Sequence, residues 1–465
     1  MASPANIDSG QGKPSRILFM ATTALSMVFI DQTVVSVSLP TIANDLGMSP
    51  ELTQWVLNGY VLSLAVFVGV SGRLSDSFGH VVMFRTGVMV FVLGSIGSGF
   101  ALSPEMMLVS RGVQGLGAAL LLPSSATLVM NAFSNSGRGR AMATYLGIAE
   151  LFLVIGPLAG GAITEYSSWR FIFLINIPVG ATVIYLLQRS RLVNDRRPGS
   201  HVDWVAALML ILGLAGLVVG LQQAGIWGAW SWLVIAIGAA LLASFVRKEL
   251  AAQQPYFNLR LFADVGLRGD AIAALCIQVA LVPATLWAAL YLQDILRFSP
   301  IEAGLSYLPF LLPMIATTFI AGKLYDRVGG RLPIVVGMST MAVGLALVAI
   351  LMPREDYWLL VPGLALFGVG LGLSLSPANT DALVRAGTES RGAISGLMQT
   401  IRQTGAALGV ALIATIVLSA TATGVKPDSS QIALGYAVCA SIVATGAILA
   451  FLLIKSRPHK SVADA

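Results

Sequence analysis

The chain has 465 residues, of which 56% are hydrophobic and only 11% are charged. A soluble domain carries about 25% charged residues, so this composition excludes an ordinary soluble protein and favours one embedded in a membrane. The formal charge of +6 comes from 28 Lys and Arg against 22 Asp and Glu, and its meaning depends on where the basic residues fall.

Fourteen apolar runs of membrane-spanning length follow one another along the chain. A helix needs about 20 residues to cross the hydrocarbon. Helices satisfy their own backbone hydrogen bonds in lipid, whereas a barrel would show alternating strands of about ten residues. The sequence therefore predicts an all-α integral membrane protein with 14 transmembrane helices. The predicted spans are 17–39, 52–72, 81–101, 105–130, 140–163, 170–188, 204–222, 230–247, 271–292, 302–322, 332–352, 358–380, 393–420 and 432–454.

The basic residues predict the orientation. With the N-terminus inside, 22 of the 28 Lys and Arg fall in inner segments. Cytoplasmic loops carry such an excess, so we expect a multi-pass protein of the cytoplasmic (inner) cell membrane with both termini in the cytoplasm. The positive charge then reflects topology, and no nucleic acid is expected as a partner. The two Cys and three His residues indicate no metal site or cofactor.

The first span contains an acid well inside it. Asp31 stands in SMVFIDQTVVSVSLP, roughly 21 Å along the helix axis and past the midplane. An ionised side chain at the bilayer centre costs at least about 2.5–3.5 kcal/mol, so such residues usually face the protein interior and carry function. Burial disfavours a charged carboxylate and a nearby cation favours it. Asp31 could therefore load and release a proton in a site that alternates between wet and dry surroundings; a fixed ion pair is the alternative.

The short turn after the second span has a second copy later in the chain. It reads GRLSDSFGH at residues 72–80, and GKLYDRVGG follows at residues 322–330. Glycines let the chain reverse and the helices approach, and the Asp could accept hydrogen bonds from a helix N-terminus across the seam between two halves. Parallel halves with matched turns are typical of secondary transporters. The predicted conformational-switch residues are Gly72, Asp76, Gly79, Gly322, Asp326 and Gly329.

The fourth span contains Arg111 in LVSRGVQGLGAALLLPSS. The stripe of Gly and Ala permits tight helix packing, so Arg111 has a close partner surface. We expect it to pair with Asp31 or with a backbone carbonyl, and to tune the protonation of Asp31. The alternative is an Arg that snorkels outward from the outer third of its span.

The fifth span combines an acid with a bend. Glu150 stands near mid-depth, one to two turns before Pro157, which frees a backbone carbonyl. Glu150 could be a second proton site or bind a cationic substrate; a permanently protonated Glu that donates one hydrogen bond is the alternative. Gly156 and Gly160 are spaced for close contact with a neighbouring helix.

An extra pair of spans, 204–222 and 230–247, separates two sets of six. We expect an N-terminal six-helix bundle at 1–188, cytoplasmic linkers with two extra transmembrane helices at 189–269, and a C-terminal six-helix bundle at 270–465.

The thirteenth span contains Arg402 in MQTIRQTGAALGVAL. We expect Arg402 to line a central cavity together with Gln399 and to balance one of the two acids. A role in helix packing alone is the alternative.

These motifs resemble those of the major facilitator superfamily. The turn matches GxLaDrxGrk at Gly72, Leu74, Asp76 and Gly79 and departs from it at Ser77, His80 and Val81. Arg111 opens a match to RxxqGxgaA, and Gly156, Pro157, Gly160 and Gly161 match the GPxxGG element of its antiporters. Fourteen spans with a pair inserted between the halves look like the drug:proton antiporter branch with fourteen helices.

The resemblance and the buried charges together predict a proton-coupled antiporter. It would export drug-like or amphiphilic small molecules, possible organic cations among them, by alternating access, as a monomer in the lipid bilayer. Proton-coupled uptake of a metabolite, or export of a lipid or another endogenous metabolite, remain alternatives. An enzyme or primary pump is disfavoured, because the chain has no HExxH, and its nearest approach to a phosphate loop, GQGKPS, has Pro14 where Ser or Thr is required.

Overall fold

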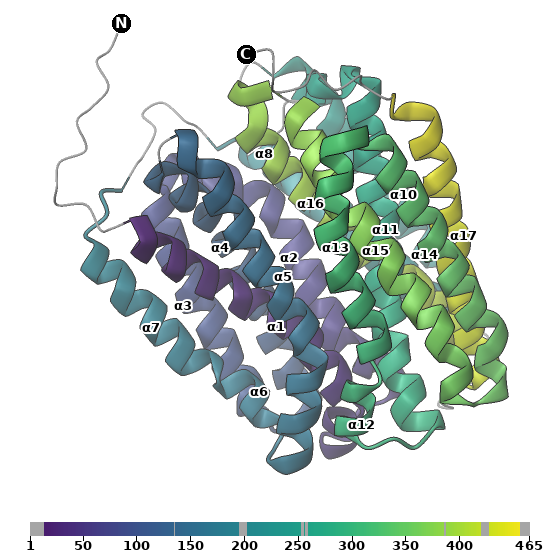
Figure 1. The fold of residues 1–465 in the computed structure, drawn as a ribbon. Helices are drawn as coiled ribbons and strands as arrows, with labels where there is room; N and C mark the ends of the chain where they lie inside the picture. Colours follow the sequence, from purple (N-terminus) through teal and green to yellow (C-terminus); the bar gives the residue numbers. More distant parts are fainter. Residues whose placement is uncertain are drawn as a thin grey trace, which may run out of the picture.

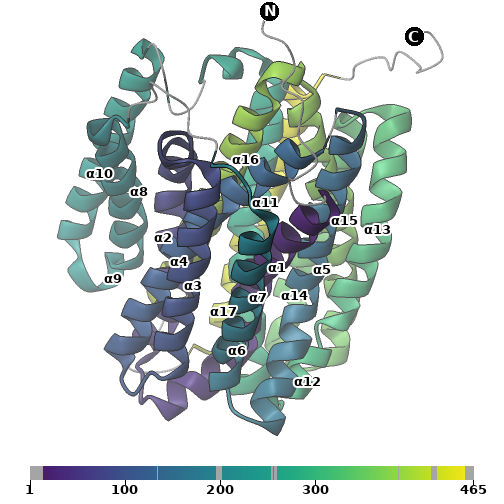
Figure 2. The same cartoon turned by 90° about the vertical axis from the view of Figure 1, so that its left-hand side faces the viewer.

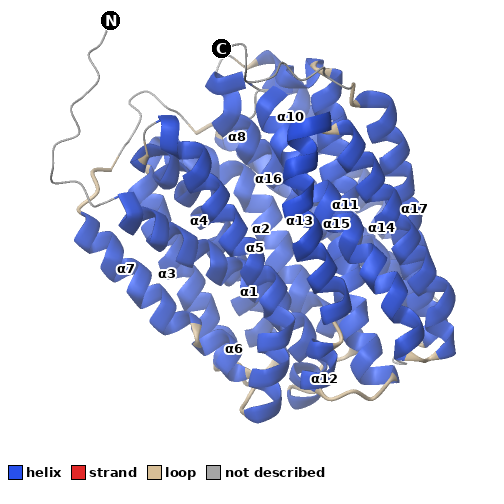
Figure 3. Ribbon diagram, in the orientation of Figure 1, coloured by secondary structure: helices blue, strands red, loops and turns tan. Residues whose placement is uncertain are grey.

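The computed structural model describes residues 14–133, 135–194, 202–252, 255, 259–385, 387–419 and 427–455. Within these ranges the regular structure is helical throughout, and no strand occurs (Figure 3). The helices form a tall bundle in which α1 begins and α17 ends at the same end (Figure 1). We call this the inner end and the opposite one the outer end.

The helices fall into two sets that we call the N-half and the C-half. The N-half contains α1 (Pro14–Asp45), α2 (Pro50–Phe78), α3 (His80–Gly99), α4 (Pro104–Ala132), α5 (Asn135–Tyr166), α6 (Arg170–Leu174) and α7 (Asn176–Ser190). The C-half contains α11 (Val265–Leu290), the π-helical turn η2 (Tyr291–Ile295), α12 (Pro300–Leu305), α13 (Leu308–Val328), α14 (Arg331–Leu351), the 3₁₀ turn η3 (Met352–Arg354), α15 (Tyr357–Arg385), α16 (Gly387–Ser419) and α17 (Ser429–Leu453). Between them lie α8 (Trp204–Gln222), α9 (Ala224–Trp227), α10 (Ala229–Ala251) and the 3₁₀ turn η1 (Leu259–Ala263).

The prediction of an all-α membrane protein is confirmed. Thirteen helical segments of the described chain are long and apolar enough to cross a membrane, and the 32-residue helix α5 coincides with the remaining predicted span. Most helices run several residues past the predicted ends, because polar residues continue the helix beyond the hydrocarbon. Three outer ends begin with a Ser N-cap followed by Pro, at Ser49, Ser103 and Ser299. Ser satisfies a free backbone N–H and Pro fits the first helical turn.

Two predicted spans are broken helices. The span predicted at 170–188 is divided at Ile175, and the one predicted at 302–322 is divided at Ser306–Tyr307. In each case the first piece ends four residues before a proline: α6 ends at Leu174 before Pro178, and α12 ends at Leu305 before Pro309. Because proline has no N–H, it cannot bond the carbonyl four residues earlier, and the helix starts anew.

Glycine contacts show that the two halves pack in the same way. A Cβ atom at Gly117 on α4 would overlap the backbone N of Phe91, and one at Gly370 on α15 would overlap that of Met341. Gly156 and Gly160 on α5 meet α1, just as Gly405 and Gly409 on α16 meet α11. The repeat indicated by the two turns therefore extends to the helix interfaces, where small residues let backbones approach.

The extra pair, α8 and α10, lies at one edge of the molecule (Figure 2). Gly213 and Gly220 of α8 face Leu242 and Ile235 of α10. At the inner end Asp203 caps α8 and accepts a hydrogen bond from Lys248 at 2.8 Å, and this bond lowers the pKa of the Asp203 carboxyl. The α8 helix contacts both α2 of the N-half and α16 of the C-half, so the pair spans the seam between them.

Candidate functional site

Asp31 and Arg111 form an ion pair in the interior of the N-half. Arg111 Nη1 lies 2.6 Å from Asp31 Oδ2, and neither side chain is exposed. Arg111 Nε donates to the carbonyl of Val56 at 2.9 Å, and the guanidinium lies 4.3 Å from the centre of the Tyr60 ring. The snorkelling alternative for Arg111 is therefore wrong, because the Gly and Ala stripe of α4 brings this helix close enough for the side chain to stay inside.

Gln114 completes the shell around Asp31. Its Nε2 donates to Asp31 Oδ1 at 2.8 Å and lies 2.7 Å from Ser95 Oγ, while its Oε1 accepts from Arg111 Nη1 at 2.6 Å. Asn176 Nδ2 also donates to Ser95 Oγ, at 2.9 Å. The network joins α1, α3, α4 and α7. Both carboxylate oxygens of Asp31 therefore have a hydrogen-bond partner inside the N-half.

Sequence reasoning did not include Gln114, Ser95, Asn176 or Tyr60 among the predicted site residues. Placing a neutral amide or hydroxyl in a membrane helix costs far less free energy than placing a charged group there. This free-energy cost therefore does not mark such residues as functional. One signal was present: Gln114 stands three residues after Arg111, and side chains at that spacing share a helix face.

A central cavity of about 1,210 Å³ lies between the two halves. Its wall is mostly apolar, with the polar groups Gln32, Gln278, Arg402 and Gln403. Among the described lining residues, Arg402 has the only formal charge. With its amide oxygen turned toward the guanidinium, Gln278 accepts from Arg402 Nη2 and Nε at 3.1 and 3.0 Å, an orientation assigned from the bonding pattern.

Of the three predicted cavity residues, Arg402, Gln399 and Glu150, the structure places only Arg402 among the described lining residues. Arg402 lines the cavity and is 9% exposed. Gln399, one turn earlier on α16, is half-buried and is not among the lining residues, whereas Gln403 is. Glu150 lies on α5, but its side chain falls outside the described residues. Asp31 is not in the described lining either; its neighbour Gln32 is, so the ion pair lies behind the cavity wall.

The glycines of the GPxxGG element make two kinds of contact. Gly156 and Gly160 hold α5 against α1 of the same half, and a Cβ at Gly160 would lie 2.5 Å from the carbonyl oxygen of Val34. Gly161 faces the other half, where a Cβ would overlap the carbonyl of Pro300 on α12. Conversely, a Cβ at Gly304 of α12 would lie 2.7 Å from the carbonyl oxygen of Pro157. We call this contact between α5 and α12 the outer seam.

The two matched turns require glycine at one position each. Gly79 and Gly329 have φ of 93° and 76°, a region that other residues rarely adopt. Gly72 and Gly322 have open space where a Cβ would stand. Asp76 is half-buried and lies 4.0 Å from Arg73, while Asp326 is exposed.

The second turn is anchored by a charge cluster that the sequence did not single out. Tyr325 of this turn donates to Asp381 at 3.1 Å, and Arg385 Nε lies 2.6 Å from Asp381 and 3.2 Å from Asp270. Asp270 is fully buried. It stands just before the predicted start of its span at 271, so its burial was not apparent. The cluster joins the inner ends of α11, α13 and α15.

Comparison with known proteins relates the chain to a family. The sequence profile of the Major Facilitator Superfamily matches residues 21–410. The chain is 33% identical over 445 residues to the cephamycin export protein CmcT of Amycolatopsis lactamdurans, covering 94% of this chain and 90% of that one. It is 32% identical over 462 residues to the puromycin resistance protein pur8 of Streptomyces alboniger, covering 95% and 91%. It is also 32% identical over 421 residues to the multidrug resistance protein Stp of Mycobacterium tuberculosis (strain ATCC 25618 / H37Rv), covering 88% and 77%.

Proposed function

The chain belongs to the Major Facilitator Superfamily, and we propose that it is a proton-coupled antiporter that exports drug-like or amphiphilic small molecules by alternating access. We also propose that the protein acts as a monomer in the cell membrane, with both termini in the cytoplasm. Export is favoured over metabolite uptake by the relatives, which include a cephamycin export protein and a multidrug resistance protein.

The buried ion pair of Asp31 and Arg111 carries the proposal. If a proton binds Asp31, Arg111 loses its anionic partner while still buried. Breaking a buried pair in this way costs about 3–5 kcal/mol. Protonation therefore favours a conformation in which Arg111 finds water or another acceptor, and a ligand that binds two states unequally shifts the equilibrium between them. The proton and the helix arrangement are coupled through this difference.

The central cavity supports an amphiphilic substrate. Its wall is mostly apolar and carries a few polar side chains, the combination that is usual for small-molecule sites. Gln32 on α1 and Gln403 on α16 add polar groups to this wall. Gln278 and Arg402 on the facing wall can hold a polar group with acceptor atoms, while the apolar wall takes the rest.

The outer seam supports alternating access. Here α5 and α12 are in backbone contact on the outer side of the cavity, which closes that side. When the halves tilt, this glycine contact can open as a unit, because small residues form a smooth surface with little interlocking of side chains. Glu150 is kept as a candidate second acid on α5.

The experiment that tests the function uses proteoliposomes loaded with puromycin or ethidium and a trapped pH dye. A pH gradient with the acidic side outside should drive net efflux until the substrate is more concentrated outside than inside. Added substrate should move protons in the direction opposite to its own. Net substrate accumulation in the direction of proton flow would contradict antiport.

Asp31→Asn is the first variant to test. It removes the titrating group but keeps the size of the side chain, so the protein should fold while gradient-driven transport falls at least tenfold. Asp45→Asn is the matched control on the same helix. Asp45 is an exposed partner of Arg170, and surface pairs of this kind contribute at most about 1 kcal/mol, so transport should be unchanged. Full transport by Asp31→Asn would remove Asp31 from the mechanism.

A further inference from the structure

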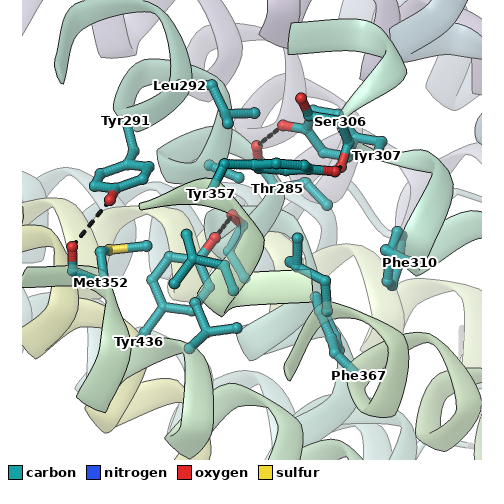
Figure 4. A pocket seen from close by; sticks show the side chains of 15 residues that line it. Thr285, Tyr291, Leu292, Ser306, Tyr307, Phe310, Met352, Tyr357, Phe367 and Tyr436 are labelled. Carbon is teal, nitrogen blue, oxygen red and sulfur yellow. Dashed lines mark hydrogen bonds between the residues drawn. The ribbon is translucent and has the colours of Figure 1, made fainter. Parts of the chain in front are cut away.

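A second cavity of about 460 Å³ lies inside the C-half (Figure 4). It is bordered by α11, the turn η2, the junction of α12 and α13, α14 with the turn η3, α15 and α17, and we call it the side cavity. Its wall includes four tyrosines and two phenylalanines, and none of the described lining residues is charged. Tyr291, Phe367 and Tyr436 are at most 2% exposed, so this part of the wall belongs to the protein core.

Every hydroxyl of the described wall is already used as a donor. Figure 4 shows tyrosine hydroxyls turned toward backbone carbonyls. The occupant therefore meets ring faces, ring edges and alkyl groups, but no free donor. An occupant without charge and without hydrogen-bonding groups suits such a wall. The donor and acceptor residues are Tyr291 and Met352, Tyr307 and Thr285, Tyr357 and Ser306, Tyr436 and Ala284, Thr285 and Val282, and Ser306 and Glu302.

The internal repeat explains why the C-half has a cavity at this position. Gly117 and Gly370, which make matching contacts, align Arg111 with Leu364 and Gln114 with Phe367. In the N-half the corresponding volume is filled by the Arg111 network; in the C-half, Leu364 and Phe367 line the side cavity. Replacing a long guanidinium by a shorter apolar side chain leaves a dry, apolar space. Such spaces take up benzene-like molecules and stay free of water.

The side cavity shares a wall with the central cavity. Thr285, Tyr307 and Phe310 line both. Tyr307 stands at the break between α12 and α13, and the Phe310 and Phe367 rings pack with centres 4.6 Å apart. Rotation of these side chains would join the two spaces without moving a whole helix.

We propose that the side cavity binds the uncharged aryl or alkyl part of the exported amphiphile, while its polar part stays beside Gln278 and Arg402 in the central cavity. The inference rests on the proposed export function and specifies the substrate class. The occupant comes from the central cavity, because that is the space with which the described wall residues are shared. A molecule with one apolar ring or chain and one polar end fits both spaces.

Photolabelling tests the proposal directly. Proteoliposomes of phosphatidylethanolamine and phosphatidylglycerol are irradiated with 3-phenyl-3-(trifluoromethyl)diazirine, a small uncharged aryl probe, and insertion sites are mapped by mass spectrometry. We expect labelling of lining residues such as Tyr291, Leu360 and Tyr436. A transported amphiphile, puromycin or ethidium, should reduce it at least fivefold. Labelling that oleic acid reduces but the amphiphile does not would overturn the proposal in favour of a lipid chain.

A matched pair of variants on α14 provides the control. Val348 lines the side cavity and is 1% exposed, whereas Val343 is 58% exposed. Val348→Phe should abolish labelling of the cavity residues and lower transport of amphiphiles with a large apolar part. Val343→Phe should leave both unchanged. Equal labelling of the two variants would contradict the proposal.

Leu364→Ala keeps the test open if Val348→Phe does not fold. It enlarges the side cavity, so labelling by a naphthyl diazirine should rise at least twofold relative to the phenyl probe; an unchanged ratio would contradict the proposal. This labelling ratio is measured without any transport assay.

The labelling and transport results separate the two proposals. If neither puromycin nor ethidium is exported but the cavity residues are labelled, the export function is contradicted and the proposal for the side cavity is supported. If export is normal and the cavity residues are not labelled, the export function is supported and the proposal for the side cavity is contradicted.

Discussion

At the scale of single residues, the two halves use equivalent positions in different ways. The matching contacts of Gly160 and Gly409 align Asp31 with Cys276, and those of α4 and α15 align Arg111 with Leu364. The N-half therefore holds a buried ion pair where the C-half holds a thiol and an aliphatic side chain. In the C-half a buried charge cluster lies at the inner end, around Asp270 and Arg385, and Arg402 lies at the central cavity. Charge is placed asymmetrically on a nearly symmetric scaffold.

Removing Arg111 tests whether its main partner is Asp31. Arg111→Met leaves the carboxylate buried without its cation, which should lower the free energy of unfolding by about 3–5 kcal/mol. Adding Asp31→Asn removes the uncompensated charge, so the double variant should regain most of that stability without regaining transport. Thermal unfolding in detergent and transport in proteoliposomes measure the two effects. A double variant as unstable as Arg111→Met would show that Arg111 stabilises the fold through other contacts.

Sequence reasoning found the charged residues of the site and missed the neutral ones. Asp31 and Arg111 stand out because a charge in lipid is costly, and the structure brings them together. Gln114, Ser95 and Asn176 carry no such cost, and only the packing of four helices shows that they share one network. The side cavity was beyond sequence reasoning altogether, because it is a missing volume that appears only when the two halves are aligned in space.

At the scale of helices, the GPxxGG element has two functions on two faces. Gly156 and Gly160 fix α5 within its own half, while Gly161 meets the opposite half at Pro300. The sequence predicted close packing but not this division, because spacing does not tell which neighbour each glycine meets. The broken helices were missed for a related reason: Pro40, Pro123 and Pro283 stay inside continuous helices, so a proline in a span does not by itself indicate a break.

Gly161→Val should prevent the outer seam from closing. Its side chain would overlap the backbone of α12, which has no flexible side chain to move aside at this contact. We expect correct folding, because the seam lies between halves, together with at least a tenfold loss of transport. Gly147→Ala is the control on the same helix, since a Cβ there meets open space in the described structure. Normal transport by Gly161→Val, measured in proteoliposomes, would show that the seam need not close tightly.

At the scale of the whole molecule, alternating access requires the outer seam to open in each cycle. Leu158 of α5 and Ile301 of α12 lie beside the seam glycines Gly304 and Gly161. Leu158→Cys with Ile301→Cys therefore places a thiol on each side of the seam, where a disulfide can join the halves without a new side chain at either glycine. In a background with Cys276 and Cys439 replaced by Ala, oxidation should stop transport and dithiothreitol should restore it.

A second cross-link provides the control within one half. Ser38 Oγ and Thr164 Oγ1 lie 2.7 Å apart between α1 and α5, so Ser38→Cys with Thr164→Cys can form a bond that does not cross the seam. Oxidation of this pair should leave transport largely intact. If both cross-links stopped transport equally, the loss would reflect local rigidity, and motion between the halves would no longer be supported.

The position of α8 has a consequence for molecules dissolved in the lipid leaflets. It covers the boundary between α2 and α16, and its Leu221 carbonyl accepts a hydrogen bond from Thr415 Oγ1 of α16 at 2.6 Å, so that flank of the protein is shielded from the acyl chains. The flank bordered by α5 and α13 has no such cover in Figure 1. A compound dissolved in the leaflets therefore meets α8 before it can reach the boundary between α2 and α16.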